Sequence, residues 1–185
     1  MAEQLELVAE ARAPGIDLLR GLQSDGSALS ELAAYLRETI GADPVTGLDS
    51  QKRFEGRLSQ ELKRAARFGH ATAVAVFELR NLESLDLEVA AAAMAGAATR
   101  LQAELRDIDT VARLAGARFA ALLPMCDTAS ATMVAGRALA ALAALDGVTA
   151  VAGVASSSEG GAWELLESAE LAAAGASAAR ATVAA

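Results

Sequence analysis

The order of strand-like and helix-like segments along most of the chain is the feature that most restricts its fold. Residues 72–79 and 148–155 are short apolar runs rich in β-branched side chains, which is typical of buried strands. Residues 110–114 and 118–123 have the same character and flank Ala115-Gly116-Ala117, a spacing that predicts a β-hairpin. The sequence therefore predicts four strands, two of them joined by a tight turn.

Helical patterns lie between these strands. Residues 87–105 and about 127–145 carry apolar side chains at spacings of three and four, and residues 50–68 precede the first strand with the same pattern. A final helix is expected from Ala162. From the first strand onward the order is strand, helix, strand, strand, helix, strand. This order predicts a ferredoxin-like α+β fold, with a mainly antiparallel sheet and helices on one face.

The first part of the chain differs from the rest because it lacks strand patterning. We expect residues 1–41 to form a helical segment and residues 42–185 to form the main domain. Four apolar side chains at helical spacing make one stripe in this segment, namely Leu29, Leu32, Leu36 and Ile40. The stripe is too short to hold a coiled coil alone, so it is expected to pack on the main domain or in a dimer.

Charge and composition exclude several classes of function. Lys and Arg number 16 against 24 Asp and Glu, a net charge of -8 that argues against binding nucleic acid or anionic membrane. The single cysteine, Cys126, and the single histidine, His70, leave no disulfide framework and little scope for zinc chemistry. No apolar run approaches the about 20 residues that a bilayer requires. We expect a cytoplasmic protein without membrane insertion.

A family resemblance begins at residues 43–48, with the sequence DPVTGL. This segment resembles the D-x-L-T-G-L turn that opens GGDEF domains, the bacterial diguanylate cyclases. Residues 111–124 resemble the signature hairpin of that family, residues 148–155 its late strand, and residues 165–170 the start of its last helix. The resemblance implies the GGDEF fold and a role in bacterial signal transduction through cyclic di-GMP.

The signature itself departs from the family pattern. Where the family has G-G-D/E-E-F, this chain has Ala115, Gly116, Ala117, Arg118 and Phe119. The resemblance implies metal binding at the two acidic positions, and neither alanine nor arginine can supply it. Only Glu78 remains of the acidic stretch after the first strand, and the phosphate-contacting lysine and nearby tyrosine of the family fall on Ser177 and Ala174. We therefore expect a degenerate domain that is not an enzyme and holds no metal or cofactor.

One element of the family is retained, the R-x-x-D motif of the inhibitory site, where the product cyclic di-GMP binds. Arg106 and Asp109 carry it, and five residues separate Asp109 from Ala115, as in the family. An arginine fork can donate to guanine O6 and N7, and a carboxylate can accept from the guanine N–H groups. The resemblance also places Arg137 at the ligand. On the helix of residues 50–68 the arginines share one face, from which Arg64 or Arg67 is expected to reach a ligand held by a second protomer.

Each of these residues also has a purely structural interpretation. Arg106 can favour the C-terminal dipole of the preceding helix, and Asp109 can cap a turn. The arginines of residues 53–67 can form a solvated helix face. Arg118 is either an anion contact or a solvent-facing hairpin residue, and Cys126 is expected to be a buried structural cysteine.

Two functions follow from these alternatives. In the first, the chain is a catalytically inactive receptor that binds cyclic di-GMP and couples it to a homodimer or a signalling partner. In the second, it is a dimerisation or docking scaffold that binds no nucleotide. Arg106 and Asp109 discriminate between them: the receptor requires both to be exposed and to point to one side, and burial of either in an internal ion pair favours the scaffold.

Overall fold

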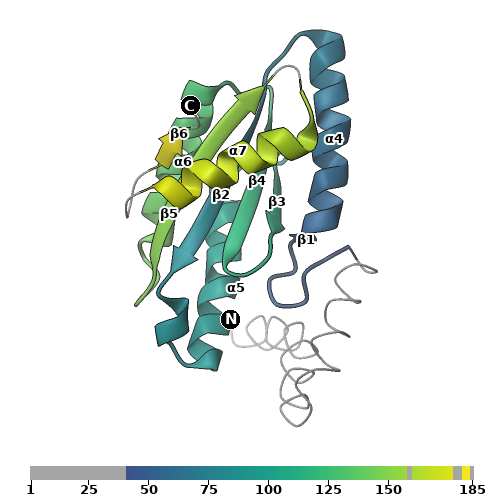
Figure 1. Cartoon of the computed structure of the whole chain (residues 1–185). Coiled ribbons are helices and arrows are strands. Elements are labelled where there is room, and N and C mark those ends of the chain that lie inside the picture. The colour runs from purple at the N-terminus through teal and green to yellow at the C-terminus, as the bar shows by residue number, and fades with distance from the viewer. Residues whose placement is uncertain (1–40, 158–159, 177–180, 184–185) are drawn as a thin grey trace, which may run out of the picture.

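The computed structural model describes residues 41–157, 160–176 and 181–183, and within these ranges the chain forms a six-stranded sheet with four α-helices (Figure 1). The strand order is β1-β3-β4-β2-β5-β6. The two long central strands are β2 (Thr72–Arg80) and β5 (Thr149–Ser157). The others are β1 (Asp49–Ser50), β3 (Thr110–Arg113), β4 (Arg118–Pro124) and β6 (Ala181–Val183).

The sheet is mainly antiparallel, as the sequence predicts. Strand β2 pairs antiparallel with both β4 and β5, and β3 pairs antiparallel with β4. Parallel pairing occurs at the two edges, where β1 joins β3 and β6 joins β5. The α+β class is therefore confirmed, and the edge strands β1 and β6 are additions that the sequence patterns did not reveal.

The helices cover both faces of the sheet: the two helices within the predicted order lie on one face, as expected, and the two helices outside that order cover the other face. Helices α5 (Leu87–Glu104) and α6 (Thr128–Leu142) share one core with Ala75 and Phe77 of β2. Helices α4 (Gln51–Phe68) and α7 (Ala162–Gly175) share a second core with Val74 and Val76 of the same strand. Since β2 is apolar on both sides, each side must be covered.

Local sequence signals account for the helix ends. Ser50 caps α4 by accepting a hydrogen bond from the Arg53 N–H, and the helix ends at Gly69 in the left-handed conformation. Asp127 caps α6 through the Ser130 N–H at 2.8 Å. A short 3-10 turn, residues 82–84, leads into α5. The predicted bounds of these helices are met within a few residues, with the largest difference at the end of α6.

Some expectations concern residues outside the described ranges. The helical segment of residues 1–41, with its Leu29–Ile40 stripe, lies almost wholly outside them, and so does Ser177. The division of the chain into residues 1–41 and 42–185 therefore stays a prediction. Across the described helices, none is both long enough and apolar enough to cross a membrane.

Candidate functional site

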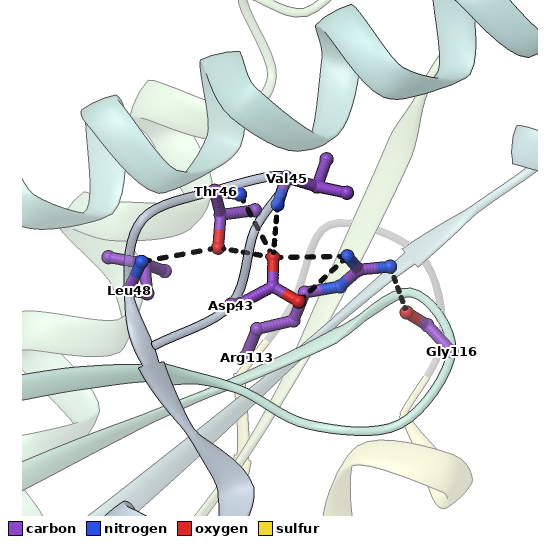
Figure 2. A network of polar contacts seen from close by, with 6 residues as sticks. All are labelled: Asp43, Val45, Thr46, Leu48, Arg113 and Gly116. Atoms are coloured by element: carbon purple, nitrogen blue, oxygen red, sulfur yellow. Dashed lines mark hydrogen bonds and ion pairs between the residues drawn. The ribbon is translucent and has the colours of Figure 1, made fainter. Parts of the chain in front are cut away.

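The opening turn, residues 43–48, is built around the buried carboxylate of Asp43, which is 2% exposed (Figure 2). Its Oδ1 atom accepts hydrogen bonds from the backbone N–H groups of Val45 (3.1 Å) and Thr46 (2.9 Å) and from the Thr46 hydroxyl (2.9 Å). The turn closes through a backbone bond from Asp43 to Leu48. These local bonds explain why Asp and Thr occur at this spacing.

Arg113 joins this turn to the signature hairpin. Its Nη1 atom donates to both Asp43 carboxylate oxygens at 3.1 Å, and its Nη2 atom donates to the Gly116 carbonyl at 3.3 Å (Figure 2). The Arg113 side chain is 17% exposed. The opening turn therefore helps to fix the position of the hairpin tip.

The signature hairpin keeps a tight geometry with altered side chains. Gly116 has a φ of 70°, which favours glycine, and the Leu114 N–H donates to the Arg118 carbonyl at 2.9 Å. Ala117 is half-buried against the core of α5 and α6. Arg118 forms an ion pair with Glu170 of α7 at 3.0 Å. Neither interpretation of Arg118 from the sequence anticipated that partner.

Glu78 and Arg80 lie next to this ion pair on strand β2. Glu78 is the register partner of Arg118, and its carboxylate lies 3.6 Å from the guanidinium of Arg80. Arg80 also donates to the Ala176 carbonyl at the end of α7 (3.3 Å). Within the described ranges, His, Cys, Asp and Glu side chains nowhere gather in groups of three or more that could hold a metal ion. The expectation about metals and cofactors stays a prediction.

Arg106 and Asp109 form a turn between α5 and β3 that two hydrogen bonds close. The Asp109 N–H donates to the Arg106 carbonyl, and the Arg106 N–H donates to Asp109 Oδ2, each at 2.9 Å. Asp109 is half-buried, and its Oδ1 atom is covered without a hydrogen-bond partner in the described structure. Arg106 is exposed, and its guanidinium makes no hydrogen bond or ion pair within the described residues.

The structure brings Arg137 to this end of the sheet but does not join Arg64 to the turn. Arg137 of α6 donates from Nη2 to the Glu104 carbonyl at 2.8 Å, and its Nε atom lies 3.4 Å from Glu104 Oε2. Arg64 pairs with Glu61 of its own helix at 3.3 Å, and α4 covers the opposite face of the sheet from α5 and α6. The prediction that Arg64 or Arg67 contacts a ligand held by a second protomer stays untested.

Two neighbours of the turn were not part of the predicted site, namely Glu104 and Cys126. Burial raises the pKa of the Cys126 thiol, and the nearby Arg106 guanidinium opposes that shift. Cys126 is 2% exposed, so the prediction of a buried cysteine is confirmed. No spacing signal connects Glu104 with Arg137, because they lie on different helices and meet only in the folded chain.

Comparison with known proteins defines the class. The family described as "Diguanylate cyclase, GGDEF domain" matches residues 40–162, and the chain belongs to this family. Among curated proteins it resembles the diguanylate cyclase TpbB of Pseudomonas aeruginosa strain UCBPP-PA14, with 32% identity over 128 residues. That match covers 66% of this chain and 29% of TpbB, so the chain spans less than a third of its relative.

Solved structures agree with this assignment. The GGDEF domain of TpbB from strain PAO1 superposes with a TM-score of 0.72 at 26% identity, covering 78% of this chain and 94% of that domain. The coiled coil and GGDEF domain of DgcB from Caulobacter crescentus, in complex with c-di-GMP, gives a TM-score of 0.72 at 18% identity. It covers 90% of this chain and 97% of the chain in that structure, and at that identity it supports the fold alone.

These comparisons contradict one expectation from the sequence, that the chain is not an enzyme. The matched family and the curated relatives from two P. aeruginosa strains are all named diguanylate cyclases. That expectation rested chiefly on single side chains such as Ala117 and Arg118. The surrounding hairpin keeps the geometry of a tight turn around these altered side chains.

Proposed function

We propose that this GGDEF domain is a receptor for cyclic di-GMP and that the ligand binds at the turn of Arg106 and Asp109. The observation that carries the proposal is the state of Arg106. Its guanidinium is exposed and, within the described residues, has no internal carboxylate partner. All N–H donors of an arginine in this state are available to bind a ligand.

The turn supplies complementary groups for a guanine base. Arg106 donates to O6 and N7 of the base, and the Asp109 carboxylate accepts from the base N–H groups. One Asp109 oxygen braces the turn through the Arg106 N–H, and the other is covered without a partner. A buried acceptor without a partner is costly, so turning this oxygen outward to a ligand donor relieves that cost.

The scaffold alternative has less support at this position. It would be favoured if Arg106 or Asp109 were buried in an internal ion pair, and within the described ranges neither residue is in one. The expectation that both are exposed is met by Arg106 alone, since Asp109 is half-buried. The c-di-GMP in the DgcB complex belongs to that protein, and it supports the proposal only as a ligand that this fold accommodates. The receptor role does not depend on whether the chain also produces the ligand.

Calorimetric titration of the whole chain with cyclic di-GMP tests the proposal. We expect saturable binding, and we expect Arg106→Ala to weaken it by at least about fivefold, because one bidentate base contact contributes roughly 1–3 kcal/mol. Lys52→Ala is the matched control, since it removes one exposed positive charge from the first turn of α4.

Two outcomes would overturn the receptor role at this turn. One is the absence of heat with the native chain at about 100 µM ligand, which leaves no affinity of regulatory use. The other is an Arg106→Ala variant that binds as tightly as the Lys52→Ala control. Turnover of GTP with Mg²⁺ is measured in the same preparations, because cyclic di-GMP made by the protein itself would affect the binding measurement.

A further inference from the structure

We propose that Glu104 competes internally for Arg137 and thereby lowers the affinity of the turn for cyclic di-GMP; this inference rests on the proposed function. Arg137 holds Glu104 by two atoms, Nη2 to the backbone carbonyl at 2.8 Å and Nε to the carboxylate Oε2 at 3.4 Å. Nε and Nη2 form one edge of the guanidinium. That edge is one of the two that an arginine uses for two-point binding of a phosphate or a base.

The position of Glu104 makes it a competitor at the ligand site. Glu104 is the last residue of α5 and lies two positions before Arg106, whose own guanidinium is free within the described structure. Of the two arginines gathered at this end of the sheet, one is therefore available and the other is occupied. A ligand that recruits Arg137 through its Nε and Nη2 edge must first displace the Glu104 carboxylate.

The charge balance around the turn points in the same direction. Arg137 is paired with the carboxylate of Glu104, Arg106, Asp109 and Asp127 all lie near Cys126, and Asp107 follows Arg106 in the chain. Cyclic di-GMP adds two phosphate charges to a cluster that is already acidic. Neutralising Glu104 therefore loosens its hold on Arg137 to the backbone carbonyl contact alone and removes one repulsive charge in the same step.

The exposure of the pair limits the size of the effect. The side chains of Arg137 and Glu104 are 59% and 34% exposed. Ion pairs this accessible to solvent contribute little, so the ligand can displace Glu104. Glu104 thus raises the concentration at which the site fills by a small factor.

Titration of Glu104→Gln with cyclic di-GMP tests this inference. The substitution keeps the shape of the side chain and the backbone carbonyl contact while it removes the charge. We expect binding about threefold tighter than native at low ionic strength. Glu167→Gln, which removes an exposed carboxylate from α7, is the matched control and is expected to leave the affinity unchanged.

A second variant separates release of Arg137 from the loss of repulsion. We expect Arg137→Ala in the Glu104→Gln background to lose most of the gain, because the freed cation is then absent. The gain is also expected to shrink in about 0.5 M NaCl, where the Debye length is only a few ångströms. A gain that survives removal of Arg137 in full would overturn the competition.

The results distinguish this inference from the function on which it rests. If native protein binds and Glu104→Gln binds equally or more weakly, Glu104 does not compete for Arg137, and the receptor role stands. If Glu167→Gln tightens binding as much as Glu104→Gln, the effect is one of net charge and the inference is wrong. If neither native protein nor Glu104→Gln binds, both proposals fail together.

Discussion

At the scale of single residues, the carboxylate of Asp43 connects the opening turn to the signature hairpin. It accepts bonds from its own turn and holds both contacts of the Arg113 Nη1 atom. The carboxylate is buried, so removing it leaves Arg113 without its charged partner at a largely covered position. Loss of one member of a buried pair is among the costly changes in proteins.

We expect Asp43→Ala to lower the free energy of unfolding by about 3 kcal/mol, because the turn and the arginine lose their acceptor together. Denaturation with urea, followed by circular dichroism, measures the change. Asp43→Asn keeps one acceptor oxygen and is expected to lose less. Glu55→Ala, which removes a half-buried carboxylate of α4, serves as the control, and equal losses in the two alanine variants would contradict this role of Asp43.

At the scale of elements, α7 lies directly on strand β5 at Gly153. A Cβ atom at this position would lie 2.1 Å from the Ala173 backbone nitrogen and 2.2 Å from the Ala169 carbonyl oxygen. Those atoms belong to the backbone of α7, so a side chain can fit only if the helix moves. The same helix carries Glu170, the partner of Arg118, and its position therefore also affects the signature hairpin.

We expect Gly153→Ala to destabilise the domain by about 1–3 kcal/mol, since one methyl group overfills the contact between strand and helix. Gly136→Ala is a matched control in the interior of α6, where a Cβ would meet nothing within 4 Å. That substitution is expected to stabilise the helix by about 1 kcal/mol. Thermal unfolding distinguishes the two, and a neutral Gly153→Ala variant would contradict the close contact.

The same elements indicate what the sequence could and could not predict. The strands β2 and β5 and the helices α4 and α5 follow from apolar periodicity, which depends on local sequence alone. The edge strand β1 has only two residues, too few for a pattern, and it exists because it pairs with β3. The second covered face was missed for a related reason: the pattern of α7 gives its apolar stripe but not the side of the sheet on which it packs.

The residues of the candidate site also fall into two groups, those that a local motif indicates and those that only the folded chain brings together. Arg106 and Asp109 were found because they lie in one short motif. Glu104 was not connected with Arg137, and Arg118 was not connected with Glu170, because each pair joins elements that are distant in the chain. Assigning the chain to non-enzymes was wrong because it weighed individual side chains more heavily than the family of the whole domain.

At the scale of the whole molecule, the sheet connects the proposed ligand turn with the rest of the domain. The turn leads directly into β3, which pairs with β4, and β4 pairs with the central strand β2. A ligand that binds only the folded state stabilises every element that unfolds together with its site. The effect of cyclic di-GMP should therefore be visible in global unfolding as well as at the turn.

We expect cyclic di-GMP at one hundred times its dissociation constant to raise the free energy of unfolding by about 2.7 kcal/mol. For a domain of this size the midpoint of thermal unfolding rises by several degrees. Arg106→Ala at the same ligand concentration is expected to show a smaller shift, because less of it is bound. An equal shift in native and variant protein would mean that the stabilising ligand binds elsewhere, and the connection from the turn through β3 to the sheet would then have no part in it.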